Sequence, residues 1–172
     1  AKRISEVLNE TSDLKNPEHP FMKVEDGSIE FRHVDFAYKK DSDEPVLEDI
    51  DLKIRSGETI GIIGGTGSGK SSVVNLIPRF YEPTKGEVRI DDIPVQNFRL
   101  SDLRKQIGLA TQDVLLYSDT IEGNIAYGDS SIDLEEVEKF AKYSAASDFI
   151  SKMPEGYDTV VGERGVGLSG GQ

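Results

Sequence analysis

The 172-residue chain contains no cysteine, which excludes disulfides, thiolate metal sites and cysteine nucleophiles. Basic residues are also scarce, because 20 Lys and Arg stand against 32 Asp and Glu and leave a formal net charge of −12. A polyanion would be repelled by this charge on average, so we expect no nucleic-acid partner. Long apolar runs are missing too, and none approaches the roughly 18 to 20 residues that span a bilayer. We therefore expect no membrane-spanning helix within these residues.

The first 27 residues differ in character from the rest of the chain. Apolar residues at helical spacing within positions 4–8 predict a short helix. Positions 9–27 are polar, carry two prolines and have the composition of a linker. We expect residues 1–27 to join an upstream domain to an α/β domain at residues 28–172.

The middle of the chain predicts a strand, a glycine-rich loop and a helix in direct succession. Residues 59–63 form a nearly continuous apolar run, as expected of a strand that is buried on both faces. Glycines fill residues 64–69, and residues 71–80 then show apolar positions at helical spacing. A second short strand is expected at residues 107–110. These elements predict a mostly parallel core sheet around the loop.

Further elements are expected on both sides of this core. Alternating apolar residues predict strands at 29–38, 46–54 and 87–90, the first of which supply an antiparallel layer. Ser101 is the expected N-cap of a helix that ends at Gln106.

The last part of the chain is expected to form a helical subdomain at about residues 130–172. Asp133 with Glu136 fits an N-cap and its partner at the start of a helix, and a second short helix is expected at 145–153. The acidic cluster at 133–138 is expected to be a solvated face. The predicted fold class is therefore α/β: a core sheet around the glycine-rich loop, an antiparallel layer and a helical subdomain.

The glycine-rich segment satisfies the pattern G-x-x-x-x-G-K-[ST] from Gly64 to Ser71. Glycines let successive backbone N–H groups point into one concavity that binds phosphate oxygens. Lys70 supplies a point charge for the outer phosphates, and the Ser71 hydroxyl is a hard ligand for Mg²⁺. The predicted nucleotide-binding residues here are Gly65, Thr66, Gly67, Ser68, Gly69, Lys70, Ser71 and Ser72. The alternative is a glycine-rich turn that binds nothing.

Downstream motifs discriminate among phosphate-loop proteins. The GTPase motifs D-x-x-G and N-K-x-D are absent, whereas Leu168-Ser169-Gly170-Gly171-Gln172 closes the chain. With the phosphate loop upstream, this pentapeptide resembles the signature motif of the ATP-binding cassette family. Segments 79–83, 118–125 and 162–165 resemble export-type cassettes, and residues 3–8 resemble the helix that precedes them.

The resemblance implies roles for residues outside the phosphate loop. Tyr38 matches the position whose ring stacks on adenine, and Gln112 matches the glutamine that approaches Mg²⁺ and the attacking water. Lys70 and Gln112 are thus the candidate catalytic residues, and Ser71 and Gln112 the candidate metal ligands. Ser169, Gly170, Gly171 and Gln172 would contact the γ-phosphate of ATP bound to a second cassette.

The function implied is an ATPase that powers export of a substrate, with ATP and Mg²⁺ as cofactors. Its partners would be a second nucleotide-binding domain, identical or not, and a transmembrane domain of the same transporter. Its place would be the cytoplasmic face of the cell's inner membrane. The family's catalytic glutamate follows the signature, so we expect residues 1–172 alone to bind nucleotide without appreciable turnover.

Two alternatives from other classes stay open at this point. A soluble cassette ATPase of DNA repair would need a long coiled-coil insertion, but residues 113–166 carry no sustained heptads. A non-catalytic nucleotide-binding domain is the other.

Asp91 and Asp92 imitate a catalytic strand end, yet we expect an ordinary turn there. His19 and His33 lack metal-ligand partners at useful spacing, so we expect them to be surface or strand residues.

Overall fold

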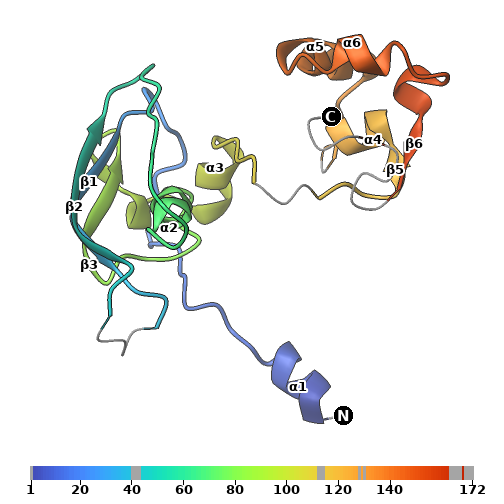
Figure 1. The fold of residues 1–172 in the computed structure, drawn as a ribbon. Helices are drawn as coiled ribbons and strands as arrows, with labels where there is room; N and C mark the ends of the chain where they lie inside the picture. Colours follow the sequence, from blue (N-terminus) through green and yellow to red (C-terminus); the bar gives the residue numbers. More distant parts are fainter. Residues whose placement is uncertain are drawn as a thin grey trace. The chain divides into compact units, whose positions relative to one another are not determined.

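The computed structural model describes residues 2–39, 44–111, 115–127, 129, 131–162 and 168. It consists of two compact units, residues 1–108 and 109–172 (Figure 1). Within the described residues, no helix combines the length and the apolar character that a membrane crossing requires.

The first unit is built on a four-stranded antiparallel sheet with the order β2-β1-β3-β4. Its strands are β1 (Ile29–Phe36), β2 (Leu47–Ile54), β3 (Lys85–Ile90) and β4 (Ile93–Pro94). The apolar residues Phe31, Val34 and Phe36 of β1 are buried, although the register shifts twice along its pairing with β2. The predicted antiparallel layer is thus confirmed, and β1 ends two residues before Tyr38.

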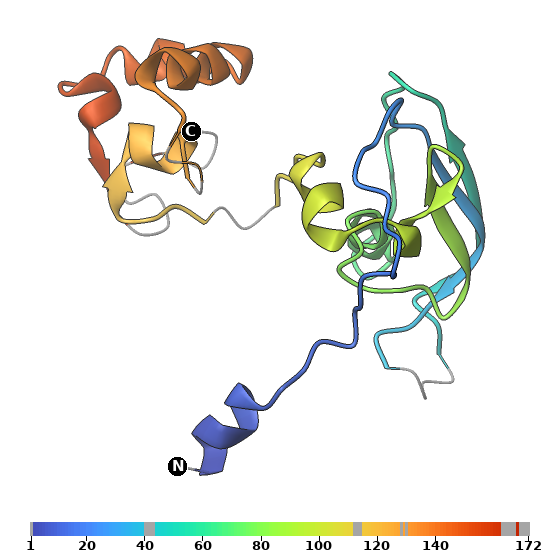
Figure 2. The same cartoon turned by 180° about the vertical axis from the view of Figure 1, so that it is seen from behind.

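The first unit also contains four short helices: α1 (Lys2–Leu8), α2 (Lys70–Leu76), the 3-10 helix η1 (Val95–Asn97) and α3 (Leu100–Lys105). Both α2 and α3 lie on the same side of the sheet (Figures 1 and 2). Leu76 of α2 and Leu103 of α3 are fully buried in one apolar cluster with Phe31 and Phe98. Each such side chain contributes about 1.5 to 3 kcal/mol by leaving water.

The two strands predicted for the parallel core do not form. Residues 59–63 and 107–110 have no strand structure, and Ile63 is 99% exposed. An apolar run becomes a buried strand when neighbours pair with both of its edges and other elements cover both faces. Among the described residues, neither segment takes part in a strand pairing, so neither meets that condition here. The α/β class is confirmed, but this part of the sheet prediction was wrong.

The second unit contains β5 (Asp119–Thr120), α4 (Ile121–Ile125), α5 (Leu134–Tyr143), α6 (Ser147–Ile150), η2 (Gly156–Asp158) and β6 (Val160–Val161). Strands β5 and β6 pair antiparallel, and the core comprises Ile121, Ala141, Ile150 and Val161. The predicted N-cap of α5 is confirmed, because the Asp133 carboxylate accepts the Glu136 N–H at 3.0 Å.

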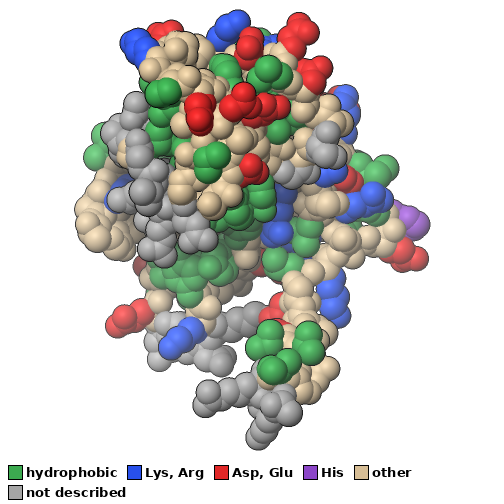
Figure 3. All heavy atoms as spheres, turned by 90° about the vertical axis from the view of Figure 1, so that its right-hand side faces the viewer, with side chains coloured by type: hydrophobic (Ala, Val, Ile, Leu, Met, Phe, Trp, Pro, Cys, Tyr) green, Lys and Arg blue, Asp and Glu red, His purple; other side chains and the backbone are tan. Residues whose placement is uncertain are grey.

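Acidic side chains gather over the part of the molecule where α5 and α6 lie (Figure 3). Asp133, Glu135 and Glu136 are exposed, and Glu138 is half-buried. The expected solvated face is therefore present.

The linker is held against the first unit by side chains far away in sequence. Both oxygens of Asp91, in the turn after β3, accept hydrogen bonds from the four backbone N–H groups of residues 25–28. Asn16 Oδ1 accepts the Leu100 N–H at 2.9 Å and so caps α3. Ser101 was predicted for that role but lies inside the helix, whose N-cap residue Arg99 makes no side-chain cap bond. The expected turn at Asp91 is confirmed, and its carboxylate anchors the linker.

Replacing Asp91 by Asn tests this anchor. One oxygen becomes an amide group that cannot accept, so two of the four N–H groups lose their partner. We expect the free energy of unfolding to fall by about 1 to 3 kcal/mol, measured by chemical denaturation. The neighbouring substitution Asp92→Asn is the control, since that side chain is 80% exposed and makes a 3.7 Å ion pair with Arg32.

The same substitution alters the pH dependence of stability. Burial opposes ionisation of Asp91, but the hydrogen bonds from Asp26, Glu25, Gly27 and Ser28 outweigh it and hold the pKa of Asp91 below its ordinary value. The carboxylate therefore stabilises the fold at neutral pH, and this contribution is lost as the pH falls through the lowered pKa. Asp91→Asn removes that acid-dependent loss, and an unchanged acid profile would contradict the assignment.

Candidate nucleotide-binding site

Glycine is required by the backbone of the phosphate loop at two positions. Gly67 and Gly69 have φ angles of 82° and 84°, which side-chain-bearing residues rarely adopt. A Cβ atom on Gly69 would also approach the Leu47 side chain to 2.7 Å. The loop therefore keeps its conformation because these two positions lack side chains.

Backbone N–H groups at the start of α2 are available to an anion. Among the described residues, the N–H groups of positions 69–72 find no acceptor within the chain, whereas the Val73 N–H donates to the Gly69 carbonyl at 3.0 Å. Consecutive unpaired N–H groups carry partial positive charge and bind oxyanions. This arrangement is chemically suited to phosphate oxygens.

The Lys70 ammonium lies among the oxygen atoms of the same loop. Its Nζ donates to the carbonyl oxygens of Gly64 and Gly65 at 2.8 and 2.7 Å, and to Ser68 Oγ at 3.4 Å. A full positive charge is thus held beside the unpaired N–H groups. The Ser71 side chain follows directly and is exposed.

Tyr38 is tied to α2 through its hydroxyl group. The Tyr38 and Ser72 hydroxyls are hydrogen-bonded at 2.9 Å. The rings of Phe36 and Tyr81 meet the Tyr38 ring edge-on, with centroids at 4.9 and 5.1 Å. Yet 52% of Tyr38 remains exposed. A fixed and exposed aromatic ring of this kind is a stacking platform.

Tyr38 and the phosphate loop line one hollow of about 330 Å³, together with Val46. Residues 67–72 form the rest of its lining. The structure therefore brings Tyr38 together with residues 67–72, whereas the predicted Gly65 and Thr66 do not line this hollow. Val46 and the Tyr38–Ser72 hydrogen bond were missed, because neither carries a motif. One signal could have identified Val46: it directly precedes β2, whose first residue pairs with the last residue of β1, close to Tyr38.

Two parts of the predicted site are not described. Gln112 and residues 169–172 lie outside the described residues, and so do positions 163–165. Leu168, the described member of the signature pentapeptide, lines a different hollow in the second unit.

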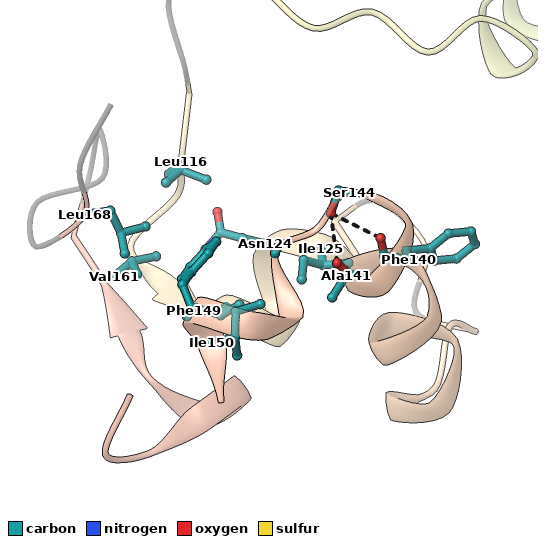
Figure 4. A pocket seen from close by; sticks show the side chains of 12 residues that line it. Leu116, Asn124, Ile125, Phe140, Ala141, Ser144, Phe149, Ile150, Val161 and Leu168 are labelled. Carbon is teal, nitrogen blue, oxygen red and sulfur yellow. Dashed lines mark hydrogen bonds between the residues drawn. The ribbon is translucent and has the colours of Figure 1, made fainter. Parts of the chain in front are cut away.

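That hollow measures about 360 Å³ and is apolar. Figure 4 shows Phe149, Ile150, Val161 and Leu168 gathered at it. Its polar side chains are committed to the backbone: Asn124 Nδ2 donates to the Thr120 carbonyl, and Ser144 Oγ donates to the Phe140 carbonyl. It therefore has no chemistry suited to a nucleotide.

His33 lies in a polar cluster that its sequence position did not predict. Asp49 Oδ1 and Asp51 Oδ2 lie 2.8 and 3.1 Å from His33 Nδ1, across the β1–β2 pair. The hydrogen bond with Asp49, and then the charge of Asp51, raise the pKa of His33 above its ordinary value. His33 lies on β1 with a 78% exposed side chain, so the expectation of a surface or strand residue is confirmed. Strand pairing also brings Asp49 and Asp51 beside it, which the sequence spacing did not indicate.

Comparisons with a family model, with curated proteins and with a solved structure all identify ABC transporters as similar to this chain. The sequence model of the ABC transporter family matches residues 47–172. Multidrug export ATP-binding/permease proteins of Staphylococcus aureus strains bovine RF122 / ET3-1 and NCTC 8325 are 46% identical over 171 residues, which is 98% of this chain and 29% of theirs. A bacterial Atm1-family ABC exporter with ATP bound is similar to 99% of this chain, over 30% of its own, with a TM-score of 0.90 and 36% identity. The chain thus spans about 29% of the length of the curated relatives named here.

Proposed function

Because the chain belongs to the ABC transporter family, we propose that it binds ATP between Tyr38 and the phosphate loop and powers export across a membrane. The observation that carries this proposal is the shared hollow. An aromatic platform and a row of unpaired N–H groups face the same space. Adenine stacks on Tyr38, and the phosphates lie against residues 67–72 and Lys70.

The chain's own groups bind and orient the phosphates. Unpaired N–H groups and the Lys70 ammonium counter phosphate charge, and such preorganised donors lower the barrier to phosphoryl transfer. Mg²⁺, when bound, neutralises charge on the outer phosphates. The exposed hydroxyl of Ser71, a hard oxygen beside the loop, fits this ion, and we propose Ser71 and Gln112 as its ligands.

The wider assembly is part of the same proposal. The relatives' names describe export proteins that combine ATP-binding and permease functions. We propose that a transmembrane domain and a second nucleotide-binding domain complete this protein at the cytoplasmic face of a membrane. Ser169, Gly170, Gly171 and Gln172 then contact the nucleotide of the second domain. The named relatives favour export over the DNA-repair alternative.

Replacing Tyr38 by Ala tests the placement of the base. We expect the affinities for ATP and GTP to fall to a similar extent, by about 1 to 3 kcal/mol, because a ring face recognises a π-surface without reading hydrogen-bond edges. Calorimetric titration with both nucleotides measures the effect.

Tyr38→Phe is the matched control. It keeps the ring and removes the hydroxyl bonded to Ser72, so most of the affinity should remain. A loss of ATP binding with GTP binding unchanged in Tyr38→Ala would contradict the stacking role. Unchanged affinity for both nucleotides would place the base elsewhere.

A further inference from the structure

A second hollow, of about 490 Å³, shares Tyr38 with the nucleotide site. Its lining includes Tyr38, residues 80–84 and, from the linker, Asp13 and Leu14. The linker therefore lines the same hollow as the ring proposed to stack on the base.

The linker is tethered directly after the two residues that line this hollow, and it forms a local turn around them. The Leu14 N–H donates to Ser12 Oγ at 3.1 Å, which forms a local turn. The Lys15 carbonyl accepts Arg79 Nη2 at 3.0 Å, and the Asn16 side chain caps α3. Leu14 is half-buried as a result. These bonds set its position by specific contacts to two other segments.

Arg79 connects the linker to Glu82, the residue that follows Tyr81. Its side chain is 4% exposed and donates from Nη2 to Glu82 at 2.6 Å as well as to the Lys15 carbonyl. The backbone of Arg79 has a positive φ of 54°. Tyr81 lies between Arg79 and Glu82, and its ring packs edge-on against Tyr38 with centroids 5.1 Å apart. The linker is thus bonded to Arg79, Arg79 to Glu82, and the chain neighbour of Glu82, Tyr81, packs on Tyr38.

We infer that linker residues 13–16 position the Tyr38 ring and thereby raise the affinity of the site for the nucleotide base. This rests on the proposed function. A ring that is already held in the stacking orientation loses less conformational freedom when a base binds. Leu14 is a positioning residue in this scheme, because it acts through Tyr81 and Tyr38. The linker reaches the phosphate site through the Tyr38–Ser72 hydrogen bond, whereas the phosphates are held by Lys70 and the unpaired N–H groups, so phosphate binding should be much less sensitive to the linker than base binding.

The intact protein is titrated by calorimetry with a non-hydrolysable ATP analogue and, separately, with inorganic tripolyphosphate, which has no base. We expect Leu14→Ala to weaken binding of the analogue about 3- to 10-fold, the scale of one edge-on aromatic contact. Binding of tripolyphosphate should change much less than binding of the analogue. Leu14→Met, of similar volume, should restore affinity for the analogue. Met22→Ala is the matched control, since Met22 is an exposed apolar residue of the same linker, away from the hollow.

Each outcome has a separate meaning. Unchanged affinity of Leu14→Ala for the analogue, while Lys70→Ala still weakens binding, would overturn the inference and leave the proposed function standing. An equal loss for the analogue and tripolyphosphate would also overturn it, because the damage would then be general. Failure of the unsubstituted protein to bind the analogue would overturn the proposed function itself.

Discussion

Replacing Lys70 by Ala should weaken ATP binding by about 1.5 to 3 kcal/mol, roughly ten- to a hundredfold in Kd. The ammonium is held at the loop by the Gly64 and Gly65 carbonyls, next to the unpaired N–H groups of residues 69–72. Its removal leaves the N–H groups as the remaining counter-charge for phosphate. Calorimetric titration at fixed ionic strength measures the change, since electrostatic binding is sensitive to salt.

Lys53→Ala is the matched control for lost positive charge. Lys53 lies on β2 with a 69% exposed side chain and makes a 3.7 Å ion pair with Glu30. We expect this variant to bind ATP as the unsubstituted protein does. If Lys70→Ala and Lys53→Ala retained the same affinity, the assignment of the phosphate site would fail.

The largest effect on stability is expected from Arg79→Met. The guanidinium is almost fully buried and satisfies Glu82 together with the carbonyl oxygens of Lys15 and Gln96. Methionine fills part of the volume but donates nothing, so three acceptors lose a partner. Because hydrogen bonds to charged groups contribute strongly and the Arg79 side chain is buried, although Glu82 is 40% exposed, we expect a loss of about 3 kcal/mol in the free energy of unfolding.

Chemical denaturation followed by circular dichroism measures that loss. Arg99→Met supplies the comparison, since Arg99 is 45% exposed and its ion pair with Asp102 is 3.5 Å long. An exposed pair of this kind contributes about 0 to 1 kcal/mol. Equal destabilisation by the two substitutions would show that Arg79 does not anchor the linker.

Local patterns along the sequence predicted several elements correctly. Alternation predicted β1 and β2, and the spacing of Asp133 and Glu136 predicted the start of α5. The order of loop and helix at Gly64 to Ser71 also holds, since α2 begins at Lys70. These features depend on contacts within a few residues, so their cause lies within the segment itself. The cassette motifs further indicated the family that the comparisons show.

The sequence by itself determined the phosphate loop, the antiparallel strands and the family, because each depends on residue types at close spacing. The tertiary structure alone decided how the linker is held, since Arg79 meets Lys15 across 64 residues and Asp91 meets Ser28 across 63. It also decided that residues 59–63 do not form a strand. An apolar segment becomes a buried strand only when neighbouring strands pair with it, and the segment itself cannot supply those strands. Contacts between distant segments depend on the path of the whole chain, and no pattern within one segment predicts that path.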